Sequence, residues 1–113
     1  MPTATALKGG LTVSAVGPLV CGLVAQQVRA DLVEGRWRQA AAGTVSLDIR
    51  NLAGRTVARV CRNLSTEAGD AVAQWPRTLP NGTAAPAGSH LLVLAASASN
   101  GTRWQAMAPL PLR

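Results

Sequence analysis

A strict alternation of apolar and polar side chains over residues 44–52 constrains the fold of this chain more than any other feature. Val45, Leu47 and Ile49 occupy every second position, and the positions between them carry a hydroxyl, a carboxylate and a guanidinium. Because successive side chains of an extended strand point to opposite faces, this spacing is typical of a strand with one buried and one solvated face. The three aliphatic residues are therefore predicted to lie in a hydrophobic core.

The segments before this strand are assigned on the same grounds. Residues 25–33 also alternate and are predicted to form one strand. Its inward residues would be Val28, Ala30 and Leu32. Residues 36–41 lie between two glycine-containing dipeptides, at 34–35 and 42–43, which favour a loop or a short helical turn there.

Four further stretches follow. Residues 55–60 and 71–75 are predicted as short strands. Residues 90–98 are apolar on both faces, as expected of a central strand that is covered on two sides. In residues 102–110, Trp104 falls on one side and Arg103 and Gln105 on the other, so this last strand should again have an inner and an outer face.

Turn signals separate these stretches. Ala53-Gly54 divides two of the strands, and Asn100-Gly101 between the last two predicts a type I′ hairpin turn. About seven short strands, with turn signals every 8–12 residues or so, are typical of an antiparallel β-sandwich. No internal repeat or linker interrupts the pattern. Residues 1–113 are therefore predicted to form one all-β domain.

Composition agrees with a packed domain. Hydrophobic residues make up 48% of the chain and charged residues 14%, with no Phe or Tyr, so Val, Leu, Ile, Ala and three Trp must fill the core. The net charge of +6 comes from dispersed arginines, which suit nucleic acid, another anionic surface or solubility alone.

The apolar stretch 11–25 is interrupted by Gly17-Pro18 and is too short to span a membrane. It is expected to form strand structure rather than a cleaved signal.

Residues 45–60, 71–97 and 100–112 together resemble the FlgD-like immunoglobulin-like domain, which occurs in the flagellar hook-capping protein and in other bacterial secreted and surface proteins. The similarity is strongest over residues 44–112. In this family a Gly-Arg hairpin turn, a Trp-Asp-Gly segment, an Asn-Gly turn and Val-Pro-Ala-Gly precede a central strand. The positions that match or bear on this pattern are Gly54, Arg55, Trp75, Asn81, Gly82, Pro86 and Gly88, with Asn100 and Gly101 in the last turn. The chain departs from the pattern at Pro76-Arg77, where the family has Asp-Gly.

The resemblance implies an immunoglobulin-like sandwich and explains why the chain is interrupted twice before residues 90–98. Asn81-Gly82 should reverse the chain, because glycine tolerates positive φ. Pro86 fixes φ and has no N–H to leave unpaired. Gly88 is expected to let the backbone pass close to a neighbouring strand.

Candidate chemical groups do not combine into a catalytic or metal site. Ser89 and His90 are adjacent on a strand and therefore point to opposite faces, so they are not expected to act as nucleophile and base. His90 is predicted to lie at the edge of the core. The five carboxylates fall on outward positions or in turns without a pairing that suits acid–base catalysis. We expect no enzyme activity, no metal, no cofactor and no small-molecule substrate.

Two sets of residues leave alternatives open. Arg36, Trp37 and Arg38 could form an interaction patch in which an exposed indole stacks on a ligand, or Trp37 could fill the interior while the arginines stay solvated. Cys21 and Cys61 could form a disulfide in an oxidising compartment, or remain two buried thiols otherwise.

The resemblance implies a non-catalytic structural or interaction module in a bacterial extracellular or cell-surface assembly, with protein partners. One alternative is a subunit of an extracellular fibre whose apolar N-terminal segment, about the first 25 residues, pairs with a neighbouring copy. A second, less favoured alternative is a basic nucleic-acid-binding module.

Overall fold

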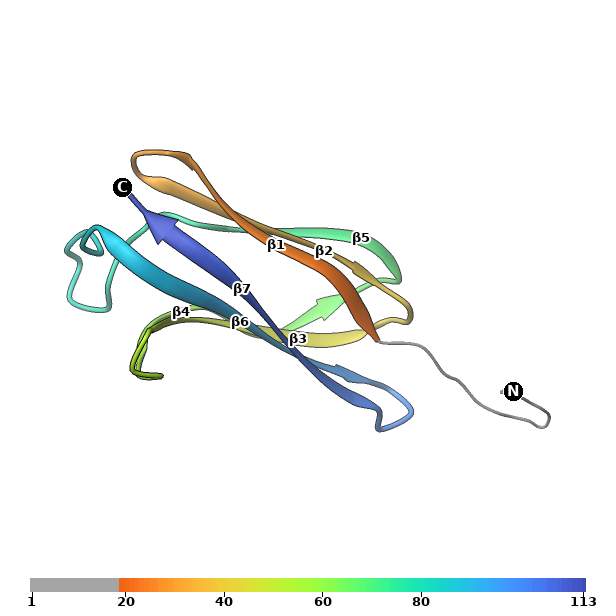
Figure 1. Ribbon diagram of the computed structural model, residues 1–113. Helices are drawn as coiled ribbons and strands as arrows, with labels where there is room; N and C mark the ends of the chain where they lie inside the picture. The colour runs from red at the N-terminus through yellow and green to blue at the C-terminus, as the bar shows by residue number, and fades with distance from the viewer. Residues whose placement is uncertain (1–18) are drawn as a thin grey trace.

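A computed structural model describes residues 19–113, which form seven strands and no helix (Figure 1). The strands are β1 (Val20–Arg29), β2 (Leu32–Gln39), β3 (Gly43–Asn51), β4 (Thr56–Thr66), β5 (Gly69–Trp75), β6 (Gly88–Ala98) and β7 (Arg103–Leu112). They make a three-stranded sheet in the order β1-β2-β5 and a four-stranded sheet in the order β4-β3-β6-β7. All pairings are antiparallel. The predicted β-sandwich is confirmed.

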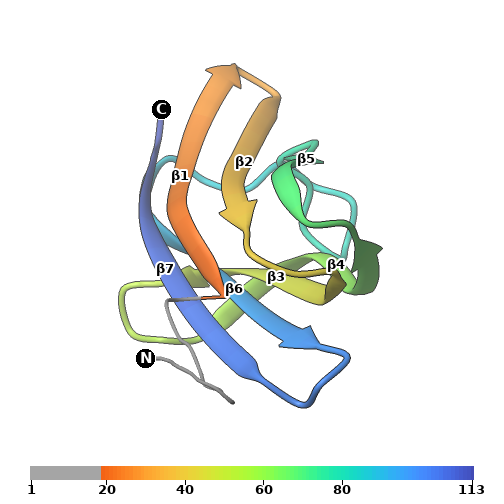
Figure 2. The same cartoon turned by 90° about the vertical axis from the view of Figure 1, so that its right-hand side faces the viewer.

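The chain passes between the two sheets three times. The β1–β2 hairpin belongs to the three-stranded sheet, the β3–β4 hairpin to the four-stranded sheet, β5 returns to the first sheet, and β6–β7 complete the second. Along one side of the sandwich β1 lies against β7, and along the other β5 lies against β4 (Figure 2). The two sheets therefore meet along both sides of the sandwich and enclose one core.

The alternation of residues 44–52 produces the centre of this core. Val45, Leu47 and Ile49 have at most 1% of their surface exposed, as predicted. They face the three-stranded sheet, where Val33 and Trp37 of β2 are also buried. Truncating one such aliphatic side chain to alanine typically costs about 2–5 kcal/mol of folding free energy. Packing of these residues holds the two sheets together.

The predicted strand over residues 25–33 is wrong, because the chain reverses within it. Arg29 is the register partner of Leu32, so Ala30 and Asp31 form the turn of a tight hairpin. Val28 and Ala30, expected inside, are exposed. No glycine, proline or asparagine stands at Ala30-Asp31, so the sequence carries no turn signal at the reversal.

The loop predicted over residues 36–41 is also wrong over most of its length. Residues up to Gln39 belong to β2, with Trp37 and Gln39 buried. The sequence did not indicate this strand because Gln39 is polar, and a polar residue at a buried position interrupts the expected apolar alternation. Its side chain accepts a hydrogen bond from the Trp37 indole (3.0 Å) and donates to the Thr66 hydroxyl (2.7 Å), which satisfies the amide inside the sandwich.

Three turns of the molecule share one five-residue geometry. In each, the fourth residue donates its N–H to the carbonyl of the first, and the first donates its N–H to the carbonyl of the fifth. The fourth residue is always a glycine with φ between 87° and 91°. This is a type I turn followed by a left-handed glycine, rather than the type I′ turn predicted at Asn100-Gly101, because Asn100 does not have positive φ. The three turns span residues 51–55, 79–83 and 98–102.

Gly88 differs from its predicted role. A Cβ at this position would meet no atom within 4 Å, so close strand approach does not require the glycine. The φ angle of 136° is what requires a glycine here, because residues with a side chain rarely adopt that conformation. The residue turns the chain into β6 by its backbone conformation.

The apolar N-terminal segment lies partly within the described residues. From Val20 onward it forms β1 and pairs with β2 of the same chain, with the Leu19 carbonyl accepting the Ala40 N–H at 2.8 Å. Residues 1–18, on which the strand-exchange alternative also depends, lie outside the described part of the chain.

Candidate functional site

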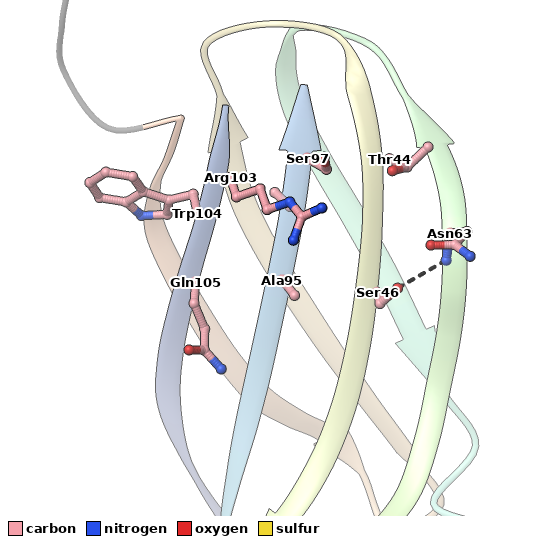
Figure 3. Close-up of a pocket in the computed structure, with 9 residues that line it drawn as sticks. Thr44, Ser46, Asn63, Ala95, Ser97, Arg103, Trp104 and Gln105 are labelled. Carbon is pink, nitrogen blue, oxygen red and sulfur yellow. Dashed lines mark hydrogen bonds between the residues drawn. The ribbon is translucent and has the colours of Figure 1, made fainter. Parts of the chain in front are cut away.

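The outer face of the four-stranded sheet carries a hollow of about 680 Å³ near the β6–β7 turn (Figure 3). Its lining is mostly small and polar, with a single charged group. The lining residues are Thr44, Ser46, Asn63, Ala95, Ala96, Ser97, Arg103, Trp104 and Gln105. We call this feature the sheet hollow.

Strand register brings these residues together from three neighbouring strands. Ser46 of β3 pairs with Ala95 of β6, which in turn pairs with Gln105 of β7. The next row along the sheet joins Thr44, Ser97 and Arg103 in the same way. Short side chains at the centre of both rows leave the sheet surface open, while the longer side chains of β7 stand at its border.

A bulge in β4 forms the opposite border. Two steps along β3, from Val45 to Leu47, correspond to three along β4, so one β4 residue is extra in the ladder. Asn63 in this bulge has a φ of 52°, and its N–H donates to the Ser46 hydroxyl at 3.0 Å instead of to a backbone carbonyl. Bulges of this kind redirect side chains at sheet edges and near binding sites.

Arg103 is the one charged residue of the sheet hollow. Figure 3 shows its guanidinium lying across β6 toward Thr44, while Trp104 points the other way. Within residues 19–113 Arg103 has no carboxylate within 4 Å. Hydroxyls, carboxamides and a free guanidinium can bind an anionic or strongly polar group, but none of them is a general acid or base near neutral pH.

The outer faces of the two sheets differ in how their arginines are neutralised. On the three-stranded sheet each arginine has a carboxylate partner at 2.8–3.0 Å. The pairs are Arg29–Asp31, Arg36–Glu34 and Arg38–Asp70.

The four-stranded sheet and its β3–β4 turn hold five arginines, of which only Arg59 is paired, with Asp48 at 3.0 Å. Arg50, Arg55, Arg62 and Arg103 have no carboxylate within 4 Å in the described chain. The Arg50 Nε is, in addition, buried without an acceptor. Most of the excess positive charge of the described chain therefore belongs to this sheet.

The predicted patch at residues 36–38 does not present an exposed indole. Trp37 is 3% exposed, whereas Arg36 and Arg38 lie on the solvated face and are paired. The structure agrees with the alternative in which Trp37 fills the interior.

Cys21 and Cys61 are free thiols, so the disulfide that the sequence left open as one alternative is not formed. Cys21 lies on β1 and Cys61 on β4, which are edge strands of different sheets at opposite sides of the sandwich. Cys21 is exposed, contrary to the alternative of two buried thiols. Burial raises the pKa of the Cys61 thiol and the Asp48 carboxylate adds to this effect, while a hydrogen bond from the Leu47 backbone opposes it.

Most residues of the family-like motif lie at the end of the sandwich near Arg113, whereas Asn100 and Gly101 lie in the β6–β7 turn at the opposite end. Trp75 is buried, and its indole donates to the Thr78 carbonyl at 3.2 Å. Arg77 has a φ of 57°, and its guanidinium donates to three backbone carbonyls, those of Ala30, Ala85 and Arg113.

The adjacent pair Ser89 and His90 is arranged as predicted, on opposite faces. His90 is buried with its Nδ1 3.1 Å from the Gly88 carbonyl, and Ser89 is exposed. They do not face each other.

No family model matches the chain, and no curated protein matches it. Residues 19–113 contain no group of three or more His, Cys, Asp or Glu side chains arranged to hold a metal ion. That same part of the chain has no helix long and apolar enough to cross a membrane.

The sheet hollow was not predicted from the sequence. The sequence predicted that Arg103 and Gln105 share a face of the last strand, and they do. Which residues of β3 they would meet depends on the register of three strands and on the β4 bulge. The Arg62-Asn63 stretch carries no glycine or proline that would have indicated that bulge.

Proposed function

We propose that this domain is a non-catalytic interaction module of a bacterial extracellular or cell-surface assembly, of the FlgD-like immunoglobulin-like type. The observation that carries the proposal is the backbone conformation of Arg77. The family pattern places glycine at this position, in its Trp-Asp-Gly segment. Arg77 adopts the left-handed φ that glycine accommodates most easily, so the chain follows a glycine-type path where its residue differs.

This conformation has a cost that the local structure offsets. A left-handed residue with a Cβ loses about 1–2 kcal/mol relative to the right-handed conformation. The Arg77 guanidinium compensates by donating to carbonyls from the β1–β2 turn, from the segment before β6 and from the end of β7. Gly54, Gly82 and Gly88, the other glycines of the motif, also have positive φ. Agreement at these four positions supports kinship with the family.

The sheet hollow is the surface we assign to interaction. It lies on an outer face that no other described element covers, and it combines hydrogen-bonding side chains with an unpaired cation. A module of this kind would dock a partner protein by this face while the core keeps the face rigid.

The test is site-specific photocrosslinking in the native host cell. A photoreactive residue replaces Gln105 in the sheet hollow, and a matched variant carries it at Gln74, which is exposed on the three-stranded sheet. We expect a discrete crosslinked protein from position 105 and none from position 74. In parallel, protease added to intact cells should cleave the domain.

Equal crosslinking from both positions, or none from either, would contradict an interaction role for this face. Protection from protease until the cells are lysed would contradict the surface location.

A further inference from the structure

The geometry points to an extended acidic polypeptide segment as the ligand of the sheet hollow, lying over β6 between the side chains of β3 and β7 and running along the strands. This inference rests on the proposed function and names the chemistry of the partner. It is carried by three features of the hollow: its unpaired guanidinium, its open floor and the spacing of its rows.

Charge complementarity favours carboxylates. Among residues 19–113, Arg103 is the sole charged residue that lines the hollow, and no carboxylate lines it. A planar guanidinium binds a carboxylate through two parallel hydrogen bonds, an arrangement that a neutral polar ligand cannot reproduce. The surrounding sheet carries three further unpaired arginines, which attract an acidic chain over a longer range.

The floor of the hollow suits a polypeptide backbone. Ala95 and Ser97 are short, so a second chain can approach the sheet closely at β6. Hydroxyls of Thr44 and Ser46 and the carboxamide of Gln105 can donate to or accept from main-chain groups of that chain. Ser46 already accepts one bond from the Asn63 N–H, which leaves its own hydroxyl proton for a ligand oxygen.

Row spacing matches an extended ligand. The two rows of the hollow lie two residues apart along the sheet, which is about 7 Å at the usual rise of a strand. Side chains at alternate positions of an extended peptide have the same spacing. A segment with a carboxylate at every second position would therefore place one over Arg103 and direct the next toward Gln105.

A single-stranded nucleic acid fits this surface less well. Its binding usually depends on aromatic side chains that stack on the bases. The indole at the hollow, that of Trp104, is turned away from the other lining side chains (Figure 3).

The probe is an eight-residue peptide of alternating Glu and Ser, acetylated and amidated at its ends, titrated into the ¹⁵N-labelled full chain and followed by NMR. A peptide with Gln in place of every Glu is the matched control. We expect amide shifts to concentrate at Thr44, Ser46 and Ser97, to weaken as salt is raised, and to be at least fivefold weaker with the Gln peptide.

Two pairs of variants separate specific docking from general basicity. Arg103→Gln should weaken binding at least fivefold, whereas Arg36→Gln on the three-stranded sheet should change it less than twofold. Ala95→Trp should fill the hollow and abolish the shifts, whereas Val72→Trp, at an exposed position of the other sheet, should not. Each variant is first checked to keep the β-sheet circular dichroism spectrum of the parent.

Equal loss from Arg103→Gln and Arg36→Gln would overturn the inference, as would shifts scattered over both sheets or no binding at low salt. Tighter binding of an oligonucleotide or of heparin, each at the same total charge, would assign the hollow to another class of polyanion. The crosslinking test is independent of these results. If a partner protein is crosslinked at Gln105 but the acidic peptide does not bind, the proposed interaction function stands and only the proposed ligand class is overturned.

Discussion

The two sheets of this sandwich share one core, but they differ in whether the arginines on their outer faces are paired with carboxylates. The three-stranded sheet pairs each of its arginines with a neighbouring carboxylate, so its surface is close to neutral. The four-stranded sheet keeps four arginines of its strands and β3–β4 turn unpaired and opens a polar hollow beside one of them. Surface ion pairs add little to stability, so this difference in pairing is expected to change the free energy of unfolding only slightly.

One glycine in each sheet leaves no room for a Cβ, but the atoms that crowd it differ, and this difference gives the largest expected effect. At Gly43 of β3 a Cβ would collide with the backbone carbonyl of Ser97, whereas at Gly35 of β2 it would lie 2.8 Å from the Leu92 Cδ2. The Leu92 methyl can move aside by a small rotation of its side chain, whereas the Ser97 carbonyl is fixed in the β3–β6 ladder. Gly43→Ala should therefore cost about 3 kcal/mol and Gly35→Ala about 1 kcal/mol, values within the range for overpacking.

Urea unfolding of the two variants and the parent measures this difference. An equal loss of unfolding free energy in both variants, or a greater loss for Gly35→Ala, would contradict the expectation that a Cβ is accommodated less easily at Gly43 than at Gly35.

A smaller effect is expected from removing one carboxylate on each sheet. Asp48 is the only acidic residue that balances the arginines of the four-stranded sheet, and its side chain is 19% exposed, against 85% for Asp70. Asp48→Asn should cost about 1 kcal/mol, because a partly buried pair is broken beside an unpaired Arg50, and Asp70→Asn should cost less than about 0.5 kcal/mol. Thermal unfolding at low and high salt checks both values.

The salt dependence sharpens the contrast between the sheets. Added salt should recover part of the Asp48→Asn loss by screening the unbalanced arginines, and should leave Asp70→Asn nearly unchanged. A loss at Asp48 that is insensitive to salt would mean that packing, rather than charge, distinguishes this position.

The smallest expected effect follows from the thiols, one on each sheet. The folded pKa of Cys61 lies above that of an unfolded thiol, about 8.5. Above that pH the unfolded chain releases the proton while the folded chain retains it, so the free energy of unfolding should fall as the pH rises through the alkaline range. Below about pH 8 the contribution is fully present. Urea unfolding from pH 7 to 10 should show a steeper decline for Cys21→Ala than for Cys21→Ala/Cys61→Ala.

Alkylation supplies the control. Exposed Cys21 should react with iodoacetamide well before Cys61, so that mass spectrometry finds the first adduct on β1. A first adduct on Cys61 would contradict both its burial and the direction of its pKa.

Alternation was sufficient to predict the sandwich, because burial of one strand face is a local property of the sequence. It correctly placed Val45, Leu47 and Ile49 inside. It failed where the chain reversed without a glycine, at Ala30-Asp31, and where a buried amide stood at a core position, at Gln39. The reversal carries no turn signal in the sequence, and the burial of Gln39 depends on Thr66, a partner that is distant in sequence.

The candidate site was harder to anticipate for the same reason. The rows of the sheet hollow join residues about 50–60 positions apart, and one border depends on the left-handed conformation of Asn63. Asparagine adopts that conformation more readily than most residues, but many asparagines do not. Sequence therefore indicated which strand face Arg103 occupies without indicating what lies beside it.

The guanidinium of Arg77 has a mechanical consequence. Its contacts join the carbonyl of Arg113, at the end of β7, to the turn between β1 and β2, and Gln27 holds the same terminal residue through its own amide. A pull on the end of β7 is thus shared between both layers, where otherwise the ladder with β6 alone would resist it and could open one bond at a time. A load applied at this end of the domain would therefore meet the side chains of Arg77 and Gln27 in addition to the β6–β7 ladder.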